Sequence, residues 1–203
     1  MKRIEYCMIV VLFSFSCRFL MIDVGSYGRQ SDGGVFGNSG LGKAMAGNRL
    51  VLPPNRSLDG STRPMPFVFI GDEAFPLQYQ LLRPYPGRNL TDVKRSYNYR
   101  LSRARRVVEN AFGILSQRFR IFQRPIAVGL STLDDIVKCA CVLHNFLLRQ
   151  DGMTQSKPDL PECPLAGIRS TGGNASTAAL AVRDTFAAFF ATTGAIPWSR
   201  TPC

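Results

Sequence analysis

Three acidic residues, Asp32, Asp72 and Glu109, stand where carboxylates could hold a divalent cation. Asp72 follows the apolar run 66–70, and a side chain at the end of a buried strand projects from the carboxyl edge of a sheet. Asp32 lies in a glycine-rich stretch, and Glu109 lies on the edge of an apolar helical stripe. Oxygen ligands suit Mg²⁺ or Mn²⁺. Two such ions, bridged by carboxylates, can clamp the attacking and leaving oxygens of a phosphodiester.

Positive charge is concentrated around Glu109. The chain has 25 Lys and Arg against 14 Asp and Glu, a formal net charge of +11 and an isoelectric point near 9.9. Residues 83–124 hold eleven of these cations and two acids, with aromatic side chains between them. Such a surface binds a polyanion in a salt-dependent way with little sequence readout, and DNA is the first candidate. The alternative is a solvated helix face with a nuclear import signal at 103–106.

Several other polar residues have a structural explanation. Taken alone, Glu109 would be a salt-bridge partner of Arg105, one helical turn earlier. His144 is the single histidine, which excludes His-rich metal sites. Its apolar neighbours favour a buried, hydrogen-bonded ring over a catalytic one. Cys139 and Cys141 are expected to be packing residues, and a zinc site is poorly supported because no CxxC pair occurs.

The elements that must position these residues begin with strands. Enrichment in Val, Ile and Phe predicts buried strands at 6–13, 19–24 and 66–72. The glycine-rich stretch 25–42 is predicted to be a loop that leads into a short helix at 41–46. Residues 47–66 show no periodicity and are predicted to be a second loop.

Helices dominate the second half. One is predicted to begin at Thr91 or Asp92, with an apolar stripe formed by Val108, Phe112, Leu115 and Phe119. A capping box at 131–134 opens the next helix, whose apolar face is expected to be Ile136, Ala140, Leu143 and Leu147. Residues 151–176 are rich in Gly, Pro, Ser and Thr and are predicted to be flexible. A last helix follows at 178–191, and the order of strands before helices indicates α/β or α+β.

The amino terminus has two interpretations. A basic start followed by the apolar run 7–17 imitates a secretory signal, and the sequons at Asn55, Asn89 and Asn174 would then be acceptors. The other interpretation is a pair of core strands, which the content of Val, Ile and Phe favours. The apolar run is shorter than the roughly 20 residues that a membrane span needs, so we expect no membrane association.

Four segments together resemble the DDE endonuclease domain of PIF/Harbinger-type transposases. They are residues 24–36 (VGSYGRQSDGGVF), 69–77 (FIGDEAFPL), 98–115 (NYRLSRARRVVENAFGIL) and 141–145 (CVLHN). The ending from Val182 to Trp198 is also similar to that family's tail. The resemblance covers nearly the whole chain from about Met8.

The resemblance implies an RNase H-like fold, in which a mixed sheet is flanked by helices. It makes Asp72 and Glu109 the second and third acids of the catalytic triad and Asp32 an additional metal ligand, with Mg²⁺ or Mn²⁺ as cofactor. DNA is the implied substrate, a Myb/SANT-like protein is an implied partner, and the nucleus is the expected location. The residues assigned to DNA binding are Lys94, Arg95, Arg100, Arg103, Arg105 and Arg106.

The same resemblance sets expectations for organisation and activity. We expect an endonuclease domain at 6–150, a flexible linker at 151–176 and a C-terminal helix and tail at 177–203. The family's first catalytic Asp stands in an Ile-Asp-Gly element on the first strand, and no such element precedes the strand at 6–13. The chain is therefore expected to be truncated at its N-terminus, to lack the first strand and to cleave DNA weakly or not at all. The alternative is a non-catalytic module that binds DNA or protein.

Overall fold

The computed structural model describes residues 10–13, 16–24, 32–150 and 175–195. The chain divides into two compact units, each of which is described by itself. The first comprises Met1–Lys43 and Arg106–Leu165, and the second comprises Ala44–Arg105 and Ala166–Cys203. Residues 6–9, most of the predicted linker and Trp198 lie outside the described residues. No helix in the described part of the chain is long and apolar enough to cross a membrane.

The first unit begins with an antiparallel hairpin. Strand β1 (Val10–Phe13) pairs with β2 (Phe19–Asp23), with a register shift between Leu12 and Phe13. In the connection, Cys17 has a φ of 57°, a left-handed conformation that is uncommon for a residue other than glycine. The hairpin confirms that two neighbouring strands occupy this part of the sequence.

The glycine-rich stretch is not a loop throughout, because it contains helix α1 (Asp32–Asn38) before α2 (Gly40–Ala46). The Ser39 hydroxyl joins the two helices, donating to the Phe36 carbonyl and accepting from the Gly42 N–H. A Cβ at Gly42 would stand 1.9 Å from the Phe36 oxygen, so the close approach requires glycine. Burial of Val35, Phe36 and Leu41 offsets the low helix propensity of the glycines.

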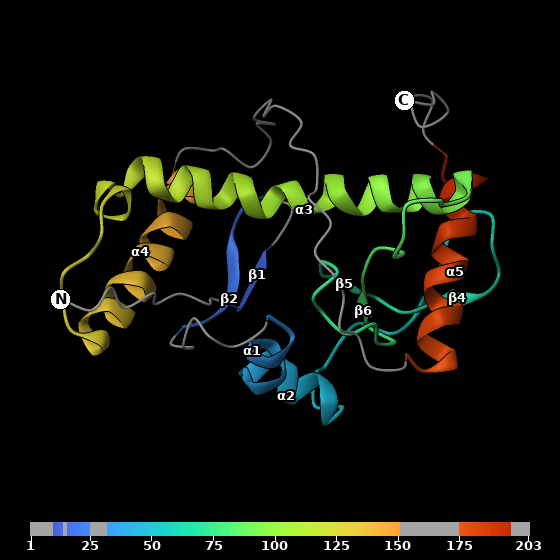
Figure 1. Ribbon diagram of the computed structural model, residues 1–203, viewed down its shortest axis with the longest axis horizontal. Helices are drawn as coiled ribbons and strands as arrows, with labels where there is room; N and C mark the ends of the chain where they lie inside the picture. Colours follow the sequence, from blue (N-terminus) through green and yellow to red (C-terminus); the bar gives the residue numbers. More distant parts are fainter. Residues whose placement is uncertain (1–9, 14–15, 25–31, 151–174, 196–203) are drawn as a thin grey trace. The chain divides into compact units, whose positions relative to one another are not determined.

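The part of helix α3 from Arg106 onward and the helix that follows it complete the first unit. Helix α3 (Asp92–Arg118) runs without interruption (Figure 1), and its predicted stripe is confirmed where Phe112 and Leu115 pack in the core of this unit. The one-turn η1 (Arg120–Gln123) follows, and then α4 (Leu130–Gln150). The core cluster consists of Phe19, Leu115, Val137, Ala140 and Cys141.

Helix α4 differs from its prediction in start and face. Its first backbone bond runs from the Leu133 N–H to the Gly129 carbonyl, so Ser131 lies inside the helix and does not cap it. The buried residues are Val137, Ala140, Cys141, His144 and Leu148, and Leu143 is 43% exposed. The buried face of α4 is therefore shifted by about one residue from the predicted face, because the side of the helix that packs against β2 is the one that becomes buried. Cys141 is a packing residue, as predicted, but Cys139 is exposed.

Two neighbouring side chains of α4 hold the hairpin. The Asn145 amide accepts from the Phe19 N–H at 2.9 Å and donates to the Phe19 carbonyl at 2.7 Å. The His144 ring is fully buried, with Nε2 2.9 Å from the Cys17 carbonyl and its centroid 5.0 Å from that of Phe19 in an edge-on contact. The prediction of a buried, hydrogen-bonded histidine is confirmed.

The second unit contains two short strand pairs. Strands β3 (Arg56–Ser57) and β4 (Pro64–Met65) are antiparallel, whereas β5 (Phe69–Ile70) and β6 (Leu81–Leu82) are parallel. The strand predicted at 66–72 is thus shortened to two residues and is not buried, since Phe67 is exposed and Ile70 is 39% exposed. Part of the apolar run 66–70 is exposed to solvent because a strand pair of two residues is too short to form a sheet with a buried face.

Helix α5 (Thr177–Ala191) supplies much of the core of the second unit and confirms the last predicted helix. Ser176 caps it, since its side chain accepts from the Ala179 N–H. One cluster joins Ala179 and Val182 of α5 to Met65, Leu77 and Leu82. A second joins Ala187 to Tyr85, Tyr97 and Leu101.

The described residues form helices with three two-stranded sheets, a mixed α/β arrangement. The predicted α/β class is therefore confirmed. The RNase H-like mixed sheet and the missing first strand stay predictions.

We expect the stability of the first unit to depend on pH through His144. Burial lowers the pKa of this histidine, which the bond to Cys17 opposes and Arg118 reinforces. The unfolded chain therefore binds the proton more readily, and stability that is present above the ordinary pKa near 6.5 is lost as the pH falls below it. Urea unfolding on either side of that pH measures the effect.

His144→Leu should abolish this pH dependence, since the chain has one histidine, and should cost about 1–3 kcal/mol at neutral pH because the Cys17 carbonyl loses its donor. Leu143→Ala, at an exposed position of the same helix, is the control that retains the dependence. A wild type with equal unfolding midpoints above and below pH ~6.5 would contradict the assignment.

Candidate active site and basic helix

Asp72 lies in the turn that follows β5, as the sequence predicted for an acid at a strand end. The Gly71 N–H, one residue earlier, donates to the Leu82 carbonyl of the neighbouring strand at 2.8 Å. One oxygen of Asp72, Oδ1, accepts from the Ala74 N–H at 2.9 Å. This local bond, an Asx turn, fixes the carboxylate just beyond the strand. The side chain is 32% exposed, so solvent and small ions reach it.

The other oxygen of Asp72 faces a cation. Arg105 Nη2 lies 3.6 Å from Asp72 Oδ2, and both side chains are partly exposed. The distance exceeds that of a hydrogen bond, so the contact is a charge pair and not a bidentate fork. Arg105 was predicted to bind DNA, and its pairing with Asp72 had no signal in the sequence. Arg105 therefore offsets the charge of this acid in the second unit.

The other two predicted acids belong to the first unit. Glu109 is exposed on α3, and Asp32 is the first residue of α1. The side chain of Asp32 lies outside the described residues, and Asp72 is described in the other unit, so convergence of the three acids stays a prediction. Across the ranges that the structure describes, no three His, Cys, Asp or Glu side chains gather as a metal-binding group.

Asp72 by itself fits one position in the ligand set of a hard cation. It is a carboxylate with one oxygen held by a backbone N–H and the other partly exposed toward a positive charge. Oxygen donors of this kind bind Mg²⁺, Mn²⁺ and Ca²⁺. A divalent ion held by this carboxylate would compete with Arg105 for its negative charge.

The six basic residues predicted to bind DNA differ in their surroundings. Lys94 and Arg95 are exposed near the start of α3, and Arg95 pairs with Asp92. Arg103 and Arg106 are partly buried further along the helix, and the Arg103 guanidinium lies 5.9 Å from the Tyr99 ring centroid.

Arg100 has a structural role within the second unit. Its guanidinium donates to the Gly194 carbonyl and lies 4.6 Å from the Phe190 ring centroid. Burial lowers the pKa of Arg100, and repulsion by Arg103 lowers it further. This side chain therefore ties α3 to the end of α5, and less of its charge is available to a nucleic acid.

Comparison with known proteins agrees with the motifs. The profile of a family described as DDE superfamily endonuclease matches residues 5–145, a segment that includes Asp32, Asp72 and Glu109. Protein ALP1-like from Arabidopsis thaliana is 29% identical over 144 residues, which cover 68% of this chain and 34% of that protein. The chain thus spans about a third of the length of this curated relative. No solved structure matches.

The extent of the profile match decides the family, because it covers more than half of the chain. Members of this superfamily generally use divalent metal ions. The resemblance to the endonuclease domain of PIF/Harbinger-type transposases is confirmed: the chain belongs to the DDE superfamily endonucleases.

Proposed function

We propose that the chain is a transposase-derived DNA endonuclease domain that depends on Mg²⁺ or Mn²⁺ and works in the nucleus. The observation that carries the proposal is the Asp72 carboxylate, fixed beyond β5 by the Ala74 N–H and facing a cation. It lies within the segment that matches the endonuclease family, together with Glu109 and Asp32. A Myb/SANT-like protein partner belongs to the same proposal.

The roles of the residues follow from their chemistry. Asp72, Glu109 and Asp32 would hold the divalent ion, which supplies Lewis-acid activation of water or a 3′-hydroxyl against a DNA phosphodiester. Lys94, Arg95, Arg103 and Arg106 would contact the phosphate backbone, which fixes the register of the DNA without reading its sequence. Arg105 offsets part of the negative charge of Asp72.

A second candidate function is DNA binding without cleavage. The Arg105–Asp72 pair favours it, because this acid is already compensated by a side chain of its own unit. Weak or absent cleavage is expected if the ion does not displace Arg105 efficiently. The two candidates differ in their dependence on a divalent metal, so one set of samples separates them.

We expect Asp72→Ala and Glu109→Ala to lose Mn²⁺ binding in a calorimetric titration. Arg105→Gln should bind Mn²⁺ up to about fivefold more tightly, because it removes a competing ion pair worth up to ~1 kcal/mol. Glu73→Ala, which removes the adjacent acid in the same turn, is the matched control and should bind as the wild type does. Equal affinities in the wild type, Asp72→Ala and Arg105→Gln would contradict the proposed ligand.

Plasmid nicking on the same samples distinguishes the two candidate functions. Mn²⁺ binding together with nicking that Asp72→Ala abolishes supports the endonuclease. A folded wild type that binds neither Mn²⁺ nor Mg²⁺ and nicks no plasmid rejects it and leaves DNA binding alone.

We expect DNA binding to fall steeply with salt and to depend on α3. In fluorescence anisotropy with a short duplex, Arg103→Gln and Arg106→Gln should each weaken binding similarly for all sequences. Each should also reduce the slope of log affinity against log salt by about one, the value for one lost phosphate contact. Arg56→Gln, an exposed arginine on β3, is the matched control. An equal loss in Arg56→Gln and both α3 variants would show that net charge, not this helix, governs binding.

A further inference from the structure

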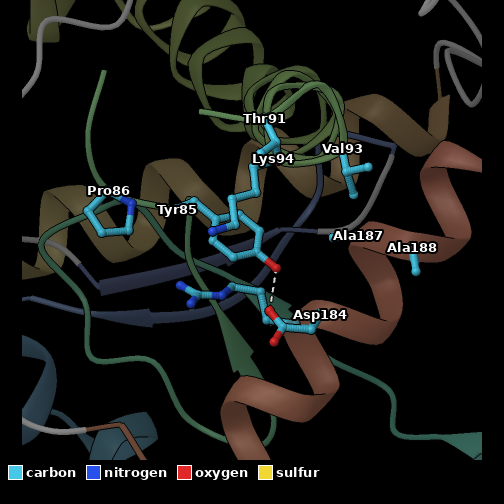
Figure 2. A pocket seen from close by; sticks show the side chains of 9 residues that line it. Tyr85, Pro86, Thr91, Val93, Lys94, Asp184, Ala187 and Ala188 are labelled. Carbon is cyan, nitrogen blue, oxygen red and sulfur yellow. Dashed lines mark hydrogen bonds between the residues drawn. The ribbon is translucent and has the colours of Figure 1, made fainter. Parts of the chain in front are cut away.

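The second unit has a pocket that contains none of the three predicted acids. Its volume is about 460 Å³, within the range of small-molecule sites. Figure 2 shows it between the start of α3 and one face of α5, with the Tyr85 ring as a central wall. The polar and charged residues of the lining include Tyr85, Lys94, Arg183 and Asp184.

Two cations of the pocket contact one aromatic ring. Lys94 Nζ lies 5.1 Å from the Tyr85 ring centroid, and Arg183 Cζ lies 4.0 Å from it. Both distances are in the range of cation–π contacts. These contacts place the charges of Lys94 and Arg183 beside the same ring in the lining of the pocket.

Asp184, the acidic residue among those that line the pocket, accepts a hydrogen bond from a neutral donor. The Tyr85 hydroxyl donates to Asp184 Oδ1 at 2.5 Å, the dashed contact in Figure 2. Burial raises the pKa of Tyr85, and the bond to Asp184 raises it further, so the phenol keeps its proton and remains a donor. One oxygen of Asp184 thus accepts a hydrogen bond from Tyr85 and is not paired with either cation.

Arg183 is a buried cation that has no carboxylate within ion-pair distance in the part of the chain that the structure describes. It is 8% exposed, and its Nε is buried with no hydrogen-bond acceptor. Its interactions with Tyr85, a side-chain hydrogen bond and the ring contact, supply no counter-charge. A desolvated guanidinium without a nearby anion is costly.

The start of α3 adds a further attraction for anions. Thr91, Val93 and Lys94 of the lining belong to this turn, and the first helical bond runs from the Arg95 N–H to the Thr91 carbonyl at 2.9 Å. The earlier N–H groups have no partner within the helix. Such groups, together with the helix dipole, favour a phosphate at an N-terminus.

We propose that this pocket binds the phosphate of a nucleotide, with Lys94 and Arg183 as its cationic ligands. The cavity exceeds the size of a phosphate ion, and the apolar side chains of Pro86, Val93 and Ala187 give the remainder of a nucleotide a surface to pack on. The nucleotide is either part of a DNA strand, a source that rests on the proposed function, or free in solution. The site is distinct from the acids and from the arginines further along α3.

The experiment titrates the whole chain with thymidine 5′-monophosphate and, separately, with inorganic phosphate, by calorimetry. Lys94→Gln should weaken binding of the nucleotide about tenfold, the effect of one lost charge-assisted hydrogen bond. Asp184→Asn keeps an acceptor for the Tyr85 hydroxyl but removes the negative charge, so it should tighten binding severalfold. Arg88→Gln, an exposed cation outside the pocket, is the charge-matched control and should bind as the wild type does.

The outcomes separate this site from the proposed function. If a short DNA duplex competes with the nucleotide, the strand is the source, and if it does not, the pocket takes free nucleotides. No binding of either probe by the folded wild type overturns the proposal, as does an equal loss in Lys94→Gln and Arg88→Gln. Because the metal titration and the Arg103 and Arg106 variants do not involve this pocket, the endonuclease proposal stands or fails independently.

Discussion

The bond pair between Asn145 and Phe19 determines how the first unit is assembled. β2 has β1 on one side, and the Asn145 amide meets both the N–H and the carbonyl of Phe19, as a neighbouring strand would. A buried strand edge is costly when its backbone groups lack partners. One side chain of α4 therefore satisfies part of that edge and fixes the helix against the hairpin, so that Phe19 can join the core with Ala140 and Cys141. His144, the preceding residue, extends the same attachment to the Cys17 carbonyl.

In the second unit, the arginines do more than confer charge. Arg100 binds the backbone at the end of α5, Arg105 compensates Asp72, and Arg183 lies against Tyr85. Guanidinium groups suit such positions because they combine a planar stacking surface with several donors. A count of basic residues consequently overestimates the charge that faces DNA. Lys94 and Arg95 are exposed, whereas Arg100 contributes mainly to packing.

The sequence predicted those elements whose signals are local. The hairpin, α3 and α5 follow from apolar patterns that their own residues carry, and Asp72 does lie beyond a strand. The prediction of a loop at Asp32–Asn38 was wrong. These residues form a helix because burial of Val35 and Phe36 outweighs the low helix propensity of glycine. The face of α4 was wrong because its packing against β2 selects the buried side. The site contacts are non-local: Tyr85 and Asp184 are separated by 99 positions, so no spacing rule connects them.

The Arg105–Asp72 pair links the two halves of the proposed function. DNA and carboxylates repel each other, so an endonuclease of this kind must neutralise its acids before the backbone approaches. In this structure Arg105 offsets part of the charge of Asp72. A divalent ion bound by Asp72 would compete with Arg105 for the carboxylate, and a guanidinium released in this way would be well suited to a phosphate oxygen. Metal binding and DNA binding are therefore expected to favour each other, because both draw on the same pair of side chains.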